Sequence, residues 1–212
     1  MTPVRPRVPS DRSALRLLLA VALLAGLPVP RAGAAPEDRV RVELDAGVLV
    51  GRRAGSVHVY RGIPYAAPPV GEQRFRPPGP APAWDGERDA GSFGPACLQL
   101  PYPEGSVYRR PPEPQSEDCL FLNVWTRFPD PEAARPVMVW FHGGGLTRGS
   151  GSLPVYDGSA LTARGVVVVT VNYRLNVFGY LAHPALRRES RERSAGNYGV
   201  LDQIAALEWV RD

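Results

Sequence analysis

Lysine is absent from this chain of 212 residues, and all 25 of its basic residues are arginines. The phosphate-binding loop of P-loop NTPases needs a lysine that reaches the terminal phosphates of the nucleotide. The sequence therefore excludes this class of nucleotide site.

Cysteine is almost as scarce, because the chain contains only Cys97 and Cys119. Their spacing does not match a zinc or redox motif, and no cluster of histidines accompanies them. We therefore expect neither a metal site nor a cofactor. In an oxidising compartment two such cysteines are more often bridged than free, and two buried free thiols are the alternative.

Apolar runs of membrane-spanning length are also lacking. The run from Leu17 to Leu27 has eleven residues, whereas a bilayer span takes about twenty. Arginines precede it at positions 5, 7, 12 and 16, and Ala32-Gly33-Ala34 follows it. This order is typical of a signal peptide with a small-residue cleavage site. We expect residues 1–34 to be removed and residues 35–212 to be secreted to the periplasm or the extracellular space. An uncleaved N-terminal anchor is the alternative.

The net charge of +4 lies in that same segment. Five arginines and one aspartate precede residue 35, so the rest of the chain has equal numbers of basic and acidic residues. A near-neutral mature chain gives no support for a nucleic-acid partner.

Hydrophobic patterning predicts an α/β fold. Residues 40–44 and 47–52 form a predicted hairpin that turns at Asp45-Ala46-Gly47, and residues 64–82 form a predicted ordered surface loop. Further strands are predicted at residues 57–60, 120–126, 137–141 and 166–171, and helices at residues 159–164 and 198–211. Ser159 is the expected N-cap of the first helix, and Gly165 ends it. Strands that alternate with helices imply crossovers and a mostly parallel central sheet.

A histidine and three glycines follow the strand that ends at Phe141. Ester hydrolysis builds negative charge on the carbonyl oxygen, and backbone N–H groups of a glycine turn can stabilise it without side chains in the way. Lipases and esterases build an oxyanion hole from this arrangement. Alone, however, a glycine-rich turn is more often an ordinary turn.

The surrounding motifs carry a specific resemblance. Glu117 to Thr126 reads Glu-Asp-Cys-Leu-Phe-Leu-Asn-Val-Trp-Thr. Other segments match the same family in order: 61–66, 68–71, 155–158, 172–174 and 196–203. From about residue 40 to its last residue the chain resembles the type-B carboxylesterases, the cholinesterase/carboxylesterase family with an α/β-hydrolase fold.

The resemblance implies roles for particular residues. Gly144 and Gly145 would donate the oxyanion-hole N–H groups, and His142 and Gly143 would shape the loop. We interpret His142 as a hydrogen-bonded loop residue rather than a catalytic base. The remaining implied features are structural: a disulfide Cys97–Cys119 and ion pairs Arg74–Glu117 and Arg174–Asp202. We expect both pairs to be buried as pairs, because an unpaired buried charge is costly.

The family's Gly-Xaa-Ser-Xaa-Gly nucleophile elbow is missing from these 212 residues. Around Ser194, Glu192 stands where the elbow needs its first glycine. We therefore expect the domain at residues 35–212 to be truncated before the elbow, with no member of the catalytic triad and no activity of its own. With strands missing, we also expect residues 166–171 to present an unpaired apolar face or edge.

Two departures bear on the substrate. Cholinesterases place a choline-binding tryptophan in the loop between Cys97 and Cys119, which here has no tryptophan, and this argues against a choline ester. Leu146 stands where the family usually has an aromatic residue after the three glycines.

The resemblance thus implies a hydrolase of small-molecule carboxylic esters with a serine nucleophile and an acyl-enzyme. A non-catalytic cholinesterase-like binding or adhesion domain is the alternative. A nucleotide-binding domain built on Gly143, Gly145 and Gly149 is remote, because these glycines are wrongly spaced for a dinucleotide turn.

Overall fold

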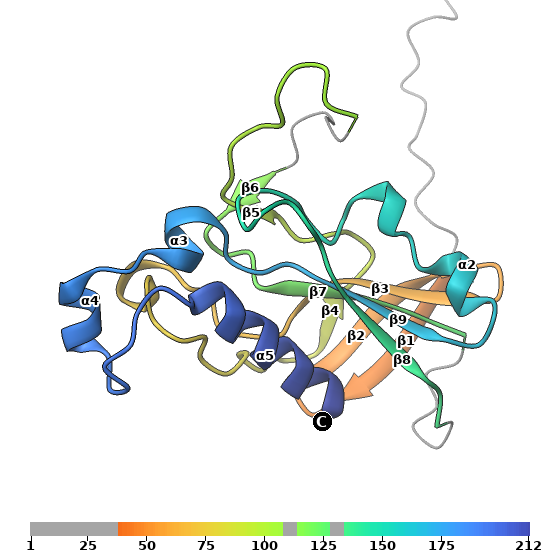
Figure 1. Cartoon of the computed structure of the whole chain (residues 1–212). Coiled ribbons are helices and arrows are strands. Elements are labelled where there is room, and N and C mark those ends of the chain that lie inside the picture. Colours follow the sequence, from red (N-terminus) through yellow and green to blue (C-terminus); the bar gives the residue numbers. More distant parts are fainter. Residues whose placement is uncertain (1–37, 108–113, 128–133) are drawn as a thin grey trace, which may run out of the picture. The chain divides into compact units, whose positions relative to one another are not determined.

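The computed structural model describes residues 38–107, 114–127 and 134–212 (Figure 1). The signal peptide predicted at residues 1–34 lies outside these residues. The described strands form one seven-stranded sheet in the order β1-β2-β3-β7-β9-β8, with β4 beside β2, and a second sheet of β5 and β6. The strand bounds are β1 Arg39–Leu44, β2 Gly47–Ala54, β3 Val57–Pro64, β4 Glu87–Asp89, β5 Ala96–Cys97, β6 Gln115–Ser116, β7 Phe121–Thr126, β8 Val137–Phe141 and β9 Val167–Val171.

The predicted N-terminal hairpin is confirmed. Strands β1 and β2 pair antiparallel, with Leu44 opposite Gly47 across the turn. Strand β3 is longer than predicted, and its pairing with β7 shifts register between Tyr60 and Ile63. Gly62 lies in this bulge with a φ of 65°, a conformation that glycine adopts readily.

The expectation of a mostly parallel sheet is wrong for the described strands. The pair β8–β9 is parallel, as its crossover predicts, but β3–β7 and β7–β9 are antiparallel. The reason is the length of a connection. A parallel crossover takes about a dozen residues or more, and only residues 127–136 separate β7 from β8. Strand β7 therefore runs opposite to β8, and hence opposite to β9, which is parallel to β8.

The open edge of the sheet is β8 rather than the strand at residues 166–171. Strand β9 is paired on both sides, with β7 and with β8. Strand β8 is the last strand in the sheet. Its residues Val137, Met138 and Trp140 are each more than two-fifths exposed in the described structure.

The α-helices are α2 Ser159–Thr162, α3 Asn176–Tyr180, α4 Pro184–Glu189 and α5 Tyr198–Arg211, and η2 Gly71–Gln73 and η3 Pro154–Tyr156 are single 3-10 turns. Helix α5 has the predicted bounds, whereas α2 is shorter than predicted. Ser159 is its first residue and not its N-cap, which is Gly158, and the Asp157 carboxylate accepts the N–H of Ser159 at 2.9 Å. Among the described residues no helix has both the length and the apolarity to cross a membrane.

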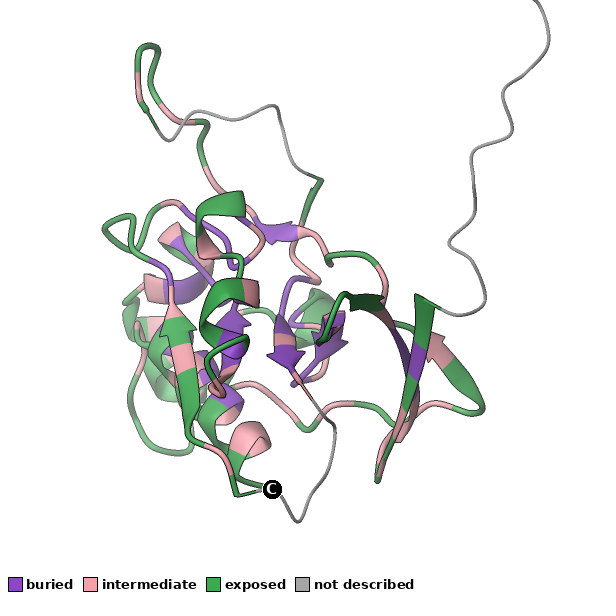
Figure 2. Cartoon of the chain, turned by 90° about the vertical axis from the view of Figure 1, so that its right-hand side faces the viewer, coloured by how far each residue is buried: buried purple, intermediate pink, exposed green. Residues whose placement is uncertain are grey.

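Side chains of successive residues point to opposite faces of the central strands, and both faces are covered. On one face Val169 and Val171 of β9 pack in the main core with Ala206 of α5. On the other, Trp125 and Val168 form a smaller cluster, and Thr162 of α2 donates its hydroxyl to the Trp125 carbonyl. Figure 2 shows that the central strands are largely buried.

The predicted ordered loop at residues 64–82 packs on the rest of the fold through its aromatic residues. Tyr65 is buried, and its hydroxyl donates to the Asn172 carbonyl at 2.7 Å. The Phe75 ring stacks against Phe178 of α3 with centroids 6.3 Å apart. The loop therefore packs against the segment that follows β9.

Candidate functional site

The glycine loop, residues 142–149, begins where β8 ends, and its first residue, His142, anchors it to the sheet. His142 is 2% exposed, whereas Gly143 to Leu146 are exposed. The imidazole stacks on the Tyr173 ring with centroids 4.5 Å apart, and the Tyr173 hydroxyl donates to the His142 carbonyl at 2.6 Å. Tyr173 follows β9, so two neighbouring strand ends hold the root of the loop.

Burial also sets the protonation state of His142. Desolvation lowers the pKa of its imidazole, although a hydrogen bond with the Gly143 carbonyl opposes the change. A histidine with a pKa below its ordinary value is neutral at pH 7. Its Nδ1 lies 3.0 Å from the Gly143 oxygen, which suits the tautomer with hydrogen on Nδ1. These contacts support the interpretation of His142 as a loop residue.

The three residues after Gly143 have positive φ angles: 128° at Gly144, 63° at Gly145 and 61° at Leu146. A side chain at Gly144 would collide with the backbone of Arg148. The Gly144 carbonyl is engaged, because it accepts from the backbone N–H and the hydroxyl of Thr147.

The backbone N–H groups of Gly144 and Gly145 donate to no other group within the described parts of the chain. Both residues are exposed, so these donors are available to a ligand. Chemically, they can bind the oxygen of a polarised carbonyl group.

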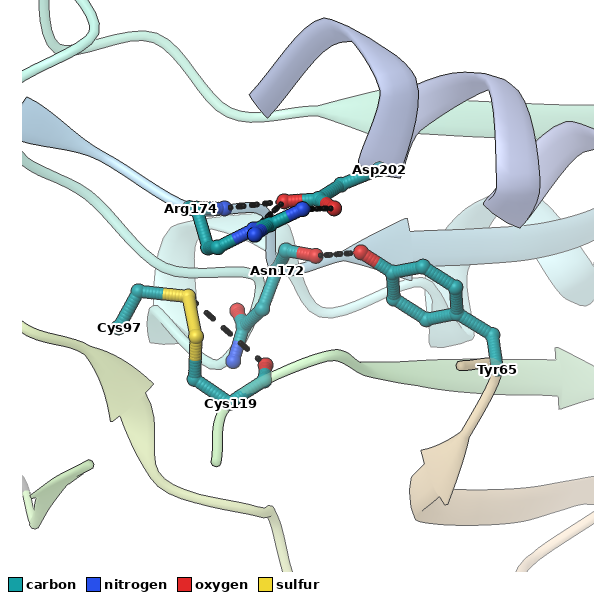
Figure 3. A network of polar contacts seen from close by, with 6 residues as sticks. All are labelled: Tyr65, Cys97, Cys119, Asn172, Arg174 and Asp202. Carbon is teal, nitrogen blue, oxygen red and sulfur yellow. Dashed lines mark hydrogen bonds and ion pairs between the residues drawn. A yellow bond between two sulfur atoms is a disulfide. The ribbon is translucent and has the colours of Figure 1, made fainter. Parts of the chain in front are cut away.

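Beyond Gly149 the chain is held by Asn172, which sequence analysis did not single out for this role. Its side-chain oxygen accepts the N–H of Gly151 at 2.7 Å, and its amide nitrogen donates to the Pro95 carbonyl at 3.1 Å. Its own carbonyl receives the Tyr65 hydroxyl (Figure 3). Asn172 lies within a motif noted in the sequence, but the motif shows neither contact.

The two cysteines are joined by a disulfide, and both are buried. Cys97 ends β5 and Cys119 directly precedes Leu120 and β7, so the bond connects the small sheet to the large one (Figure 3).

Both predicted ion pairs are formed, but their surroundings differ. Arg174 and Asp202 are 3% and 0% exposed, and the carboxylate accepts from Nε at 2.8 Å, from Nη2 at 2.7 Å and from the Arg174 backbone N–H at 3.0 Å (Figure 3). Burial raises the pKa of Asp202, and these hydrogen bonds oppose the rise. Arg74 and Glu117 are 41% and 22% exposed, so the sequence-based expectation that this pair is also buried is wrong.

The fold and these motifs agree with a family comparison, in which a sequence model of the carboxylesterase family matches residues 38–212. The chain belongs to the carboxylesterase family. It is 44% identical over 191 residues to the fumonisin B1 esterase of Sphingopyxis macrogoltabida and 46% identical over 168 residues to the para-nitrobenzyl esterase of Bacillus subtilis. These matches cover 90% and 78% of this chain.

A solved carboxylesterase of Geobacillus stearothermophilus is similar in structure as well. Its TM-score is 0.71 at 49% identity, over 82% of this chain. The chain spans about a third of the length of these carboxylesterases, with 34%, 33% and 34% of them covered. The described structure therefore corresponds to one portion of an α/β-hydrolase fold.

In the described portion of this carboxylesterase chain, His142, Gly143, Gly144 and Gly145 lie in one loop. The Gln99 side chain links this loop to Cys97, because it binds both the Cys97 carbonyl and the Gly149 N–H. Its described residues contain no group of three or more His, Cys, Asp or Glu side chains that could hold a metal ion.

Proposed function

We propose that the complete protein hydrolyses small-molecule carboxylic esters. By the complete protein we mean a polypeptide that contains these residues and has the length of its relatives. The observation that carries the proposal is the pair of exposed N–H donors at Gly144 and Gly145, held by a buried framework. Two of its relatives, a fumonisin B1 esterase and a para-nitrobenzyl esterase, are esterases by name, which supports the same chemistry.

The reaction follows from these donors. A serine hydroxyl attacks the ester carbonyl carbon, its proton passes to a base, and the carbonyl electron pair moves onto oxygen. Gly144 and Gly145 donate hydrogen bonds to that oxyanion. When it collapses, the C–O bond breaks, the base gives its proton to the leaving oxygen, and the alcohol departs from an acyl-enzyme. Water then hydrolyses the acyl-enzyme in the same two steps.

The loop suits this role because its donors need little reorganisation. Donors fixed before the reaction stabilise developing charge far better than donors that must first turn toward it. The stacking of His142 on Tyr173 and the positive φ values of Gly144 and Gly145 fix the backbone beforehand.

The proposed substrate is an ester other than a choline ester. The loop between Cys97 and Cys119 carries no tryptophan. Leu146 follows the donors and is 46% exposed, so an aliphatic side chain borders the proposed site.

We also propose that the protein is exported and that residues 1–34 are removed. The proposal rests on the arginines before the apolar run at residues 17–27, and on Ala32-Gly33-Ala34 after it. The Cys97–Cys119 disulfide is compatible with an oxidising compartment.

The test is hydrolysis of p-nitrophenyl acetate with and without an organophosphate, which labels an activated serine. We expect the complete protein to hydrolyse the ester and to lose activity as one serine outside residues 1–212 is labelled. The 212-residue polypeptide should be inactive, because no serine in it lies in a Gly-Xaa-Ser-Xaa-Gly elbow. A complete protein without activity would point to the binding-domain alternative, and a labelled serine within residues 1–212 would contradict the proposal.

A further inference from the structure

The side chain of Gln99 forms two hydrogen bonds with the backbone of one residue of the glycine loop. Its Nε2 donates to the Gly149 carbonyl at 2.8 Å, and its Oε1 accepts the Gly149 N–H at 2.7 Å. A carboxamide that binds both backbone groups of one residue fixes the position and the orientation of that peptide segment.

Gly149 in turn packs directly beneath the root of the loop. It is buried, with a φ of 115°, and a Cβ at this position would collide with the His142 Nδ1 and the Gly143 carbonyl. Any displacement of Gly149 therefore moves the residues from which Gly144 and Gly145 extend.

Gln99 is itself held by the disulfide-bonded segment. Its Nε2 also donates to the Cys97 carbonyl at 3.1 Å, and its backbone N–H donates to the Gln115 side chain at 2.9 Å. A second carboxamide, that of Asn176, bridges the same two regions by donating to the carbonyls of Leu98 and Thr147. The segment beside Cys97 is thus linked to the glycine loop at two points, Gly149 and Thr147.

We propose that Gln99 is a positioning residue for the oxyanion-hole donors, acting through Gly149. The inference rests on the proposed esterase function. Gln99 itself touches no reacting atom in this scheme. Its two bonds to Gly149 hold the loop in the geometry in which the N–H groups of Gly144 and Gly145 meet the developing oxyanion. Positioning of this kind lowers the free energy of the transition state and leaves the binding of the ground-state ester unchanged.

The test compares Gln99→Met and Gln99→Glu in the complete protein, with Gln73→Met as the matched control. Methionine keeps the length of the side chain and removes its hydrogen bonds. Gln73 is exposed in η2, and its hydrogen bonds within the described structure are those of its backbone: its N–H donates to Val70, and its carbonyl accepts from Arg76. Active sites are counted by titration with an organophosphate, so that loss of folded protein is separated from loss of rate.

We expect Gln99→Met to lower kcat per titrated site at least about tenfold, a fraction of the effect of removing an oxyanion donor, with KM changed less than about twofold. The affinity for a trifluoromethyl ketone, which binds as an oxyanion, should fall by the same factor as kcat/KM. The Gln73→Met control should match the wild type in both.

Gln99→Glu provides a rescue experiment. An ionised carboxylate accepts the Gly149 N–H but cannot donate to the Gly149 carbonyl, whereas a protonated carboxyl can do both. Its rate relative to wild type should therefore be low at about pH 8 and rise toward about pH 5, as the carboxyl approaches its usual pKa.

The outcomes separate the two proposals. Gly145→Val strains the backbone at a proposed oxyanion donor. If the wild type is active and Gly145→Val has lost at least about a hundredfold in kcat, an unchanged kcat in Gln99→Met would overturn the positioning role alone. A loss in Gln99→Met that leaves ketone affinity at the wild-type value would overturn it as well. If the wild type hydrolyses no ester, the proposed function fails with it.

Discussion

Replacement of Gly145 by valine is expected to lower kcat of the complete protein at least about a hundredfold, the loss seen when one oxyanion donor is removed. Gly145 has a φ of 63°, and a Cβ there would meet no atom within 4 Å. The substitution is therefore not excluded by packing. It is strained because a β-branched residue disfavours a positive φ, and relief of that strain turns the backbone N–H away from its proposed direction.

The chain provides a matched control at Gly55, in the turn between β2 and β3. Gly55 has a φ of 61° and likewise has no atom within 4 Å of an added Cβ. Gly55→Val thus imposes the same backbone strain away from the loop, and its kcat per titrated site should equal that of the wild type. Equal rates for folded Gly145→Val and Gly55→Val would exclude the oxyanion role.

The second large effect concerns stability. We expect Asp202→Ala to lower the free energy of unfolding of the complete protein by about 3–5 kcal/mol, the usual cost of leaving one charge of a buried pair without its partner. The Arg174 guanidinium is 3% exposed and would lose all three of the hydrogen bonds that the Asp202 carboxylate accepts from this residue.

Glu117→Ala is the corresponding change in the partly exposed pair with Arg74. Solvent screens that pair, so its loss of stability should be much smaller. Both losses are measured by urea unfolding of the purified variants. Similar midpoints for the two variants would show that burial does not distinguish these ion pairs.

Much of the fold could be predicted because its signals are local. The turn residues Asp45-Ala46-Gly47 mark the hairpin, and the spacing of apolar residues at 198–211 marks α5 with its observed bounds. The direction of β7 was not predicted, because an apolar strand that is covered on both faces has the same sequence pattern in a parallel and in an antiparallel sheet. The short connection at residues 127–136 contained the missing information.

The glycine loop was visible in the sequence for the same reason, since consecutive glycines after a buried strand form a local pattern. Its supports were not visible. Gln99 and Gly149 are 50 residues apart, and Asn172 and Pro95 are 77 apart. A carboxamide that binds backbone groups so far away in the sequence imposes no pattern on the residues near it. The conformation of the loop is therefore set by contacts that only the folded chain reveals.

The most direct test of the oxyanion role is a crystal structure of the complete protein with a trifluoromethyl ketone bound to its serine. The ketone carbon becomes tetrahedral in this adduct, and its oxygen becomes an oxyanion like that of the transition state. We expect this oxygen to lie about 2.7–3.1 Å from the backbone nitrogens of Gly144 and Gly145. An oxyanion that points away from both nitrogens, or that is bound by other donors while these two N–H groups face solvent, would contradict the proposed role.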